Sequence, residues 1–407
     1  MENYSQVIVV GGGPCGSFTA LNLAKQGVQV EVFEEHSEIG TPSHCPGHLS
    51  IKGLKNLGLH PLPAEIVENT FCGIVFHSPK NSEFSILFSS PITCTVSRVL
   101  FDKYVAEMAM KLGAKCHLNS RVESLIIKHG FVRGACIQQH GEKVQFHAKV
   151  VIDAEGVSSR ISRMAGLSPL NPSTLVNGVH AEVENVKDID ENLVEVFLGR
   201  SYAPGFYAWL IPKGEGKAKV GLAAKTGNPK ELLRKLMLKH PIASKKLCKA
   251  KILQVAFHPI PLGGPISKAY ANGFLAVGDA ASQVKPTTGG GVIFGLSCAK
   301  VAAEVVFEAL QKDDFFSAFL GLYQKRCRIN YGFDVKVMLK IRKMLNRMSD
   351  EKLDEAIRLC KKLELNEALR GIDEVDFQGK TLLKLLRNSK MLPAILYFLF
   401  LYISANP

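Results

Sequence analysis

A glycine-rich turn close to the start of the chain constrains its fold more than any other feature. The apolar run 7–10 (VIVV) leads directly into residues 11–16 (GGGPCG), and an apolar stretch containing alanine follows. This order predicts a strand, a tight turn and a helix. Gly11 would make the turn, Gly13 would leave room for a pyrophosphate, and Gly16 would let the helix pack closely on the strand. The chain is therefore expected to begin with a dinucleotide site.

An acidic residue at the end of the second predicted strand supports this interpretation. Residues 28–33 (VQVEVF) have the apolar pattern of a strand, and Glu34 follows them. At this spacing from a glycine turn, a carboxylate meets the ribose hydroxyls of a bound adenosine. Within the turn, Cys15 is expected to contribute only its backbone to the phosphate site.

Two later segments each have the pattern of a buried strand that ends at an aspartate. They are residues 150–160 (VVIDAEGVSSR) and residues 273–281 (GFLAVGDAA). Together with the glycine turn they resemble the glutathione-reductase-type FAD proteins, in the branch that contains para-hydroxybenzoate hydroxylase and geranylgeranyl reductase. The resemblance covers residues 1 to about 330. It implies FAD as the cofactor, with Asp279 on the ribityl chain.

The same resemblance implies further contacts with the cofactor. Residues 286–292 (PTTGGGV) resemble a helix start that lies under the flavin, where the helix N-terminus stabilises negative charge on the reduced ring. Arg98 matches an arginine that approaches the cofactor, with a surface salt bridge as the alternative. Val122 matches a strand whose backbone touches adenine, although an ordinary strand valine would look identical. The contacts implied here are Gly290, Gly291, Val292, Arg98 and Val122.

Two local patterns resemble those that distinguish geranylgeranyl reductases within this branch. Residues 42–50 (PSHCPGHLS), called the cysteine loop below, resemble a loop that lies against the flavin. Residues 204–214 (PGFYAWLIPKG), followed by 219–222 (KVGL), resemble the Y-x-W-x-F-P motif and its paired strand. Ile211 stands where the family usually has phenylalanine. The cysteine loop adds four residues to the implied cofactor site: Cys45, Pro46, Gly47 and His48.

Three side chains are candidates for catalysis. Cys45 lies between proline and glycine residues in a loop, where packing alone does not explain it. A thiol beside a flavin could tune the ring, donate a proton or exchange with a partner cysteine, provided that its environment perturbs it. Tyr207 and Trp209 offer aromatic faces that could stabilise developing positive charge. Aromatic packing on a strand is the alternative for both.

The predicted fold class is α/β. We expect a glutathione-reductase-type FAD-binding Rossmann domain, an interleaved antiparallel-sheet substrate domain and a helical C-terminal region. Strands such as 194–198 and 209–211 belong to the substrate sheet, and residues 58–94 are expected to add strands to it. The FAD-binding domain is placed at 1–57, 95–165 and 261–310, the substrate domain at 58–94 and 166–260, and the helical region at 311–407.

Composition suits an enzyme of this kind. The chain has 407 residues, 46% of them hydrophobic, so it can bury a large core. Its ten cysteines include no C-x-x-C pair, which argues against an iron–sulfur cluster or a zinc ribbon, and no metal site is expected. No signal-peptide pattern opens the chain, which favours a reducing cytoplasm. Cysteines in apolar stretches are expected to be core residues; they are Cys72, Cys94, Cys116, Cys136 and Cys298.

The net charge of +13 favours an anionic partner. Phospholipid headgroups suit it better than nucleic acid, since no nucleic-acid module is visible; solvated helix faces are the alternative. Residues 391–403 carry no charge and are too short to span a bilayer, so they predict an interfacial anchor, a tunnel lining or a buried helix. We expect a cytoplasmic protein, peripheral on the inner face of the cell membrane. The two basic clusters are Lys245, Lys246, Lys249 and Lys251, and Lys336, Lys340, Arg342, Lys343 and Arg347.

The resemblance implies a reaction as well as a cofactor. Reduced FAD would saturate the prenyl double bonds of archaeal membrane lipid precursors, with digeranylgeranylglycerophospholipid as the leading substrate. The external reductant stays open between NAD(P)H that docks transiently and a reduced ferredoxin, because no second strand–glycine–helix unit is present. The alternatives are an FAD monooxygenase or a quinone-type oxidoreductase of the same superfamily, and a non-catalytic flavin or lipid carrier.

Overall fold

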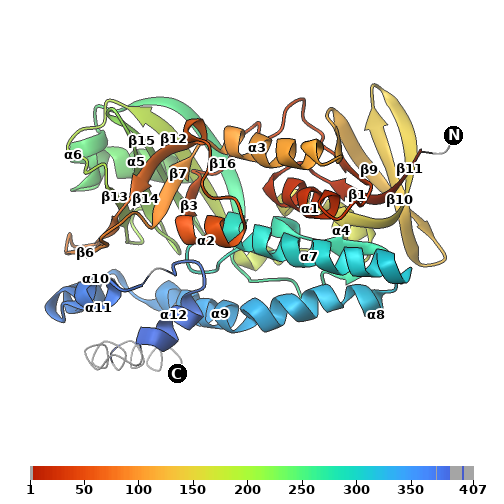
Figure 1. Cartoon of the computed structure of the whole chain (residues 1–407). Helices are drawn as coiled ribbons and strands as arrows, with labels where there is room; N and C mark the ends of the chain where they lie inside the picture. Colours follow the sequence, from red (N-terminus) through yellow and green to blue (C-terminus); the bar gives the residue numbers. More distant parts are fainter. Residues whose placement is uncertain (1–2, 373, 386–396, 398–407) are drawn as a thin grey trace. The chain divides into compact units, whose positions relative to one another are not determined.

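The structure is a computed structural model that describes residues 3–372, 374–385 and 397 (Figure 1). The chain forms two compact units, each built from three separate stretches of sequence. The boundaries fall after residues 43, 97, 174, 260 and 333, so that the stretches alternate between the first and the second unit. The boundaries of the functional domains expected from the sequence stay a prediction, because compactness alone does not define them.

A parallel sheet forms the centre of the first unit. Residues 7–10 of its middle strand pair on one side with residues 150–153 and on the other with residues 30–33. Val7, Ile8 and Val9 are fully buried, as the unbroken apolar run requires of a strand covered on both faces. The parallel strands run in the order β18 (Phe274–Ala276), β11 (Glu142–Asp153), β1 (Asn3–Val10), β2 (Val30–Phe33) and β8 (Lys115–His117).

Helices α1 (Pro14–Ala24) and α7 (Val292–Lys312) lie side by side in this unit (Figure 1). The Cys15 sulfur fills the space between them: a Cβ on Gly278 would lie 2.9 Å from Cys15 Sγ, and a Cβ on Gly295 would lie 2.6 Å from it. The Cys15 side chain therefore has a packing role beyond the backbone role predicted for it. The other helices of the unit are α3 (Arg98–Lys111), α4 (Arg160–Met164), α8 (Ser317–Leu320) and the start of α9 (Leu322–Arg347).

The rest of the first unit consists of antiparallel strands and short turns. β9 (Ser120–Lys128), β10 (Phe131–Gln139) and β11 form an antiparallel meander, and β17 (Tyr270–Ala271) pairs with β18. The second strand expected to end at an aspartate is shorter than predicted. β18 stops at Ala276, and Asp279 lies in the single-turn helix η4 (Gly278–Ala281), because Gly278 has a φ of +66° that ends the extended backbone. Two further single turns are η2 (Gly156–Ser158) and η3 (Pro172–Thr174).

A mostly antiparallel sheet forms the second unit, as the sequence predicts. Within it β13 pairs in parallel with β5, whereas the β12–β15, β15–β14, β14–β13 and β5–β6 pairs are antiparallel. The strands run in the order β16 (Lys251–Pro261), β12 (Leu175–Glu184), β15 (Lys217–Ala224), β14 (Ala208–Gly214), β13 (Leu193–Phe197), β5 (Gly73–His77) and β6 (Glu83–Leu87). Helices α5 (Pro229–Lys239) and α6 (Ala243–Leu247) contribute to the core on one face of this sheet.

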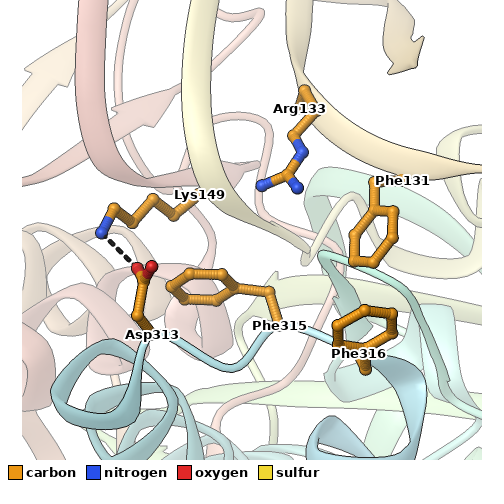
Figure 2. Close-up of a pocket in the computed structure, with 6 residues that line it drawn as sticks. All are labelled: Phe131, Arg133, Lys149, Asp313, Phe315 and Phe316. Carbon is orange, nitrogen blue, oxygen red and sulfur yellow. Dashed lines mark hydrogen bonds and ion pairs between the residues drawn. The ribbon is translucent and has the colours of Figure 1, made fainter. Parts of the chain in front are cut away.

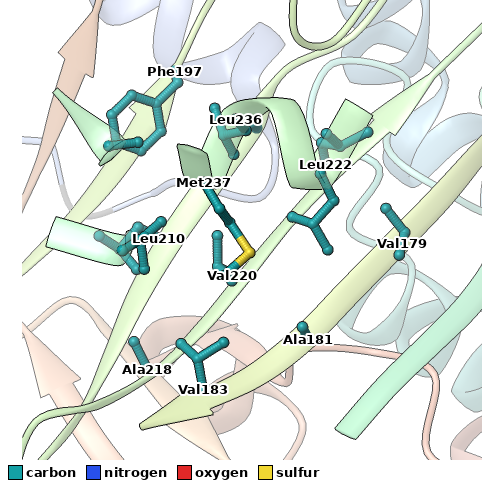
Figure 3. Close-up of a cluster of buried hydrophobic side chains, with 14 of the residues drawn as sticks. Val179, Ala181, Val183, Phe197, Leu210, Ala218, Val220, Leu222, Leu236 and Met237 are labelled. Carbon is teal, nitrogen blue, oxygen red and sulfur yellow. The ribbon is translucent and has the colours of Figure 1, made fainter. Parts of the chain in front are cut away.

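Alternation along the strands separates that core from the opposite face. Leu210, Val220 and Leu222 share an apolar cluster with Leu236 and Met237 of α5 (Figure 3). Successive side chains of a strand point to opposite faces, so the residues between these leucines and valines face away from α5. They include Trp209 of β14 and Gly221 of β15. This second face, called the site face below, is where the candidate residues of this unit gather.

The expectation that residues 58–94 extend the large sheet is correct for β5 and β6 but wrong for the flanking strands. β4 (Val67–Phe71) and β7 (Thr93–Val96) instead form a separate three-stranded sheet with β3 (His48–Ser50), since β7 lies between its two antiparallel partners. Helix α2 (Ile51–Asn56) and the turn η1 (Ala64–Ile66) adjoin these strands in sequence.

The described part of the C-terminal region is helical, as predicted. The helices after α9 are α10 (Asp350–Lys362), α11 (Leu365–Leu369) and α12 (Gln378–Leu385). Within the described part of the chain, no helix is both long and apolar enough to cross a bilayer. The predicted apolar tail, residues 391–403, lies outside the described residues except for Tyr397.

Candidate functional site

The glycine turn of the first unit has the geometry that its sequence predicts. Gly11 has a φ of +94°, and a Cβ there would lie 2.6 Å from Ala154 O. A Cβ on Gly16 would collide with Gly11 O, so only glycine lets the helix start this close to the strand. A Cβ on Gly13, in contrast, would meet nothing within 4 Å. The backbone at Gly13 can therefore be approached by a ligand, next to the unsatisfied N–H groups of the α1 N-terminus.

Glu34 lies beside this turn. The Gly12 N–H donates to Glu34 Oε2 at 2.7 Å, and the His36 N–H donates to Glu34 Oε1 at 3.0 Å. These bonds fix the carboxylate at the end of β2 while leaving lone pairs that could accept from ribose hydroxyls.

The start of α7 forms a second close backbone approach. Gly291 is the N-cap of this helix and has no side-chain cap hydrogen bond. A Cβ on Gly291 would lie 3.1 Å from Asp279 Oδ1, and a Cβ on Gly290 would lie 2.8 Å from Lys285 Cε. Asp279 therefore lies at the N-terminal end of α7, beside Gly291. Helix N-termini favour negative charge, so this end suits an anionic ring or a phosphate.

Arg98 is not a surface residue. Its Nε and Nη2 donate to Asp102 Oδ1 and Oδ2 at 3.1 and 2.8 Å, and the two side chains are 10% and 7% exposed. Burial raises the pKa of Asp102, and the Arg98 guanidinium opposes that shift. The alternative of a surface salt bridge is therefore wrong, whereas the predicted contact of Arg98 with the cofactor stays a prediction.

The strand of Val122 has a partner that sequence reasoning missed. Arg160 donates from Nη2 to Val122 O at 2.5 Å and from Nη1 to Glu123 O at 2.7 Å. These bonds hold the end of β9 against the segment after Asp153. Arg160 is the last residue of segment 150–160 described above. Its position after a predicted strand and turn could have identified it as a candidate site residue.

The first unit thus fits a dinucleotide. It combines an open backbone at Gly13, a fixed carboxylate at Glu34 and a second helix start at Gly291. Close backbone contacts require glycine at Gly11 and Gly16, and the missing side chain of Gly13 keeps the approach to the turn open.

In the second unit, hydrogen bonds order the cysteine loop. The Gly47 N–H donates to Cys45 Sγ at 3.4 Å, and Gly47 O accepts from the Val96 N–H at 3.0 Å. His48 Nε2 lies 2.8 Å from Thr93 Oγ1, which ties β3 to β7. Cys45 is partly exposed and Gly47 is buried, so the loop presents its thiol from an anchored backbone.

Of the predicted aromatic pair, Trp209 lies on β14 at the site face, and Tyr207 directly precedes this strand. The rings of Tyr207 and Trp209 are 6.0 Å apart and roughly perpendicular, and Trp209 shares an apolar cluster with Phe71 and Ile211. Trp209 pairs with Gly221 of β15, where a Cβ would lie only 2.5 Å from the indole Cζ2. The missing side chain of Gly221 therefore makes room for the indole.

Arg342 is a second residue that sequence reasoning misjudged. The prediction grouped it with exposed basic residues, but it is 7% exposed. Its guanidinium lies 4.5 Å from the centre of the Phe206 ring, which stacks on Tyr207 at 4.4 Å. Burial lowers the pKa of Arg342 to about 10 and raises that of Tyr207 to about 12, so the phenol stays protonated near neutral pH. The position of Arg342 on an amphipathic helix did not indicate that its side chain is buried.

Four charged side chains form a ring of ion pairs at the site face; they are Glu68, Glu182, Lys213 and Lys219. Lys213 Nζ lies 2.9 Å from Glu68 Oε1 and 2.8 Å from Glu182 Oε2. Lys219 Nζ lies 2.6 Å from Glu68 Oε2 and 3.9 Å from Glu182 Oε1. Two positive and two negative charges balance, which permits burial of the group.

His180 of β12 also pairs with Gly221, on the side opposite Trp209. It is 7% exposed, and burial together with the nearby Lys219 lowers its pKa to about 4. Among the described residues, neither His180 Nδ1 nor Trp209 Nε1 has a hydrogen-bond partner. The site face thus carries a neutral imidazole and an indole N–H beside this ring of ion pairs.

Comparisons with known proteins decide the family. Residues 4–312 match the family described as the FAD binding domain. A protein named digeranylgeranylglycerophospholipid reductase 2 from Methanopyrus kandleri is 32% identical over 92% of this chain and 95% of its own. A digeranylgeranylglycerophospholipid reductase from Methanosarcina acetivorans is 33% identical over 96% of this chain and 97% of its own. The chain belongs to the digeranylgeranylglycerophospholipid reductase family.

A solved structure agrees with this assignment. The geranylgeranyl bacteriochlorophyll reductase-like protein of Thermoplasma acidophilum is 26% identical and matches with a TM-score of 0.86, over 98% of this chain and 100% of that one. The predicted fold class and the predicted cofactor, FAD, are confirmed.

Several basic residues and cysteines of this family member differ from expectation. Lys246 pairs with Glu195 at 2.6 Å and Lys251 with Glu184 at 3.1 Å, so these two charges are partly neutralised. Of the five cysteines predicted to be core residues, Cys94 and Cys298 are buried, whereas the other three are partly exposed. Cys72 lies between β4 and β5, whereas Cys116 and Cys136 lie within β8 and β10, so apolar neighbours in sequence do not guarantee burial.

A shallow pocket of the first unit contains none of the predicted site residues (Figure 2). The Arg133 guanidinium lies 4.7 Å from the centre of the Phe131 ring, and Lys149 Nζ lies 2.6 Å from Asp313 Oδ1. Its basic groups are thus already engaged by protein partners. No group of three or more metal-ligating side chains occurs in the described ranges.

Proposed function

We propose that this chain reduces prenyl double bonds of archaeal membrane lipid precursors in an FAD-dependent reaction, with digeranylgeranylglycerophospholipid as its substrate. Relatives of that name match it over nearly their whole length. The observation that carries the proposal is the site face, where Trp209 and Ile211 lie in an apolar cluster of β14. A hydrocarbon chain suits such a surface better than a polar ring does.

We assign the binding of FAD to the residues that the sequence predicts for it. The dinucleotide is held by Gly11, Gly13, Cys15, Gly16, Glu34, Arg98 and Val122, and the ribityl chain and ring by Asp279, Gly290, Gly291, Val292, Cys45, Pro46, Gly47 and His48. Two observations support this assignment: the backbone at Gly13 is open to a ligand, and the Asp279 side chain lies close to the backbone of Gly291. Reduced FAD, when bound, supplies a hydride.

Three side chains of the second unit would act on the substrate. An isolated trisubstituted alkene accepts a hydride poorly, so developing positive charge on carbon must be stabilised. The faces of Tyr207 and Trp209 can do this in surroundings that exclude water. We assign to Cys45 the donation of a proton or the tuning of the ring, with the protonated Tyr207 phenol as a second candidate proton source.

The site also needs access to a membrane lipid and to electrons. We propose peripheral association with the inner face of the cell membrane through exposed basic residues. Lys336, Lys340 and Lys343 of α9 are exposed and spaced so that they share one side of the helix. The reductant is NAD(P)H or a reduced ferredoxin, and the net charge of +13 would attract an acidic carrier.

Mass spectrometry of the lipid tests this function. The purified yellow protein is incubated anaerobically with dithionite and digeranylgeranylglycerophospholipid. The molecular mass of the extracted lipid is then measured. We expect mass gains in steps of two hydrogens, and their loss in Trp209→Leu protein that retains its flavin. An unchanged lipid in the presence of reduced flavin would overturn the substrate assignment. An oxygen-dependent mass gain on an aromatic substrate would favour a monooxygenase.

A further inference from the structure

A buried lysine of β15 contacts the cysteine loop. The Lys219 side chain is 2% exposed, and its Nζ donates to Pro46 O at 2.9 Å and to Val96 O at 3.1 Å. The carboxylate of Glu68 lies 2.6 Å from the same nitrogen. Two of the three N–H groups of the ammonium therefore have carbonyl acceptors, and the adjacent carboxylate supplies the opposite charge. This set of partners holds the ammonium in one place.

The two carbonyls lie on either side of the anchored loop. Pro46 follows Cys45 directly, and Val96 is the residue whose N–H donates to Gly47 O. Lys219 therefore bridges the backbone of the loop to the end of β7, beside an existing hydrogen bond. The Cys45 sulfur accepts from the Gly47 N–H, so its position depends on the backbone that Lys219 holds.

The same lysine belongs to the strand that supports the aromatic pair. Lys219 pairs with Ile211 in the β14–β15 ladder, and Trp209 pairs with Gly221 two residues further along. We infer that Lys219 is a positioning residue, which fixes the backbone of Cys45, Pro46 and Gly47 relative to the strand that carries Trp209. This inference rests on the proposed function, in which the loop and that strand serve one site.

The surrounding charges explain why a lysine can remain ionised there. Burial lowers the pKa of Lys219, but Glu68 and Glu182 oppose that shift. Lys213 shares both carboxylates and is more exposed, at 19%; among the described residues its hydrogen bonds and ion pairs go to these carboxylates and not to the loop. Lys213 thus carries the same charge in the same ion-pair ring and provides a matched control for the loop contact.

Alkylation of Cys45 tests this inference without any lipid turnover. The FAD-loaded protein is treated with iodoacetamide, and the rate at each cysteine is followed by peptide mass spectrometry. In Lys219→Met protein we expect Cys45 to react about tenfold faster, because the loop opens locally. Cys94 of β7 is 3% exposed and reports general opening of the same unit; its rate should not change. In Lys213→Met protein the rate at Cys45 should stay within about twofold of wild type.

Three results would overturn the inference. They are an unchanged Cys45 rate in folded Lys219→Met protein, a parallel increase at Cys94, and an equal increase in Lys213→Met protein. Should Lys219→Met not fold, Lys219→Gln keeps two N–H donors and is expected to raise the Cys45 rate about threefold, and no increase there would overturn the inference as well. If lipid reduction is also observed, Lys219→Met should lower kcat about tenfold or more and leave KM for the lipid nearly unchanged. A failure of lipid reduction alone leaves the alkylation test valid.

Discussion

Burial changes the ionisation of individual residues in this chain, and Asp153 is the clearest case. It is fully buried at the carboxyl end of β11, where Ser162 Oγ donates to Oδ2 and the Glu155 N–H donates to Oδ1. Burial first, and the charge of Glu155 second, raise its pKa from 3.8 to about 7. These two donors hold the segment that follows the strand, so we assign Asp153 a structural role.

The pKa of Asp153 predicts how stability changes with pH. Because the pKa in the folded protein is raised, the contribution of Asp153 is fully present below about pH 4 and is lost as the pH rises through about 7. Asp153→Asn keeps the shape and removes this dependence. Between pH 5 and 8, wild type should lose roughly 3 kcal/mol of unfolding free energy relative to Asp153→Asn.

Urea unfolding at several pH values measures this difference. The exposed Asp188, changed to asparagine, is the control and should follow the wild-type curve. Parallel pH curves for wild type and Asp153→Asn would show that the carboxyl is not protonated in the folded protein.

At the scale of elements, the pairing of β12, β15 and β14 organises the site face. His180, Gly221 and Trp209 are register neighbours across the three strands, so their side chains share one face of the sheet. Glycine in the middle strand lets the indole lie across it. The alternating residues on the other face pack under α5 and fix this register, since a slip by one residue would exchange the two faces.

Gly221→Ala tests this arrangement. The added Cβ would lie 2.5 Å from Trp209 Cζ2 and 2.6 Å from Val179 O, so the indole must move. We expect destabilisation of about 1–3 kcal/mol and a clear loss of prenyl reduction with normal flavin content. Trp209 is the single tryptophan of the chain, so a shift of its fluorescence emission reports the movement directly. A Cβ on Gly371 would meet nothing within 4 Å, and Gly371→Ala should leave the emission unchanged.

At the scale of the whole molecule, the basic residues differ in whether they are paired, buried or exposed to solvent. Part of it is paired or buried, as at Lys246, Lys251 and Arg342. Lys336, Lys340 and Lys343 are exposed on α9 at a helical spacing. A surface of this kind attracts anionic headgroups, with an attraction that salt screens.

Sedimentation with vesicles tests the proposed membrane association. Binding to vesicles rich in phosphatidylglycerol should exceed binding to phosphatidylcholine, and should fall sharply between about 50 and 500 mM salt. Reversal of all three lysines to glutamate should weaken binding about a hundredfold or more. Reversal of the exposed Lys111, Lys128 and Lys143 changes the net charge equally, and the same loss there would contradict a role for α9.

Much of the first unit could be predicted from sequence because its constraints are local. The glycine turn, Glu34 and the apolar run 7–10 each follow from the geometry of a strand, a turn and a helix close together in sequence. The position of Trp209 on a strand was also predictable, since alternation along β14 determines which side chains share a face, whereas Tyr207 lies just before that strand.

The rest depended on contacts between segments that are distant in sequence. Arg342 looks like its exposed neighbours on α9, and only its packing on Phe206 reveals that it is buried. Lys219 looks like an ordinary strand lysine until Pro46 O, Val96 O and Glu68 converge on it. The sequence by itself determined the cofactor class and the order of the elements, because these follow from short-range backbone geometry. Only the tertiary structure decided which charges are buried and what they hold, because desolvation and ion pairing are set by neighbours that the chain brings together on folding.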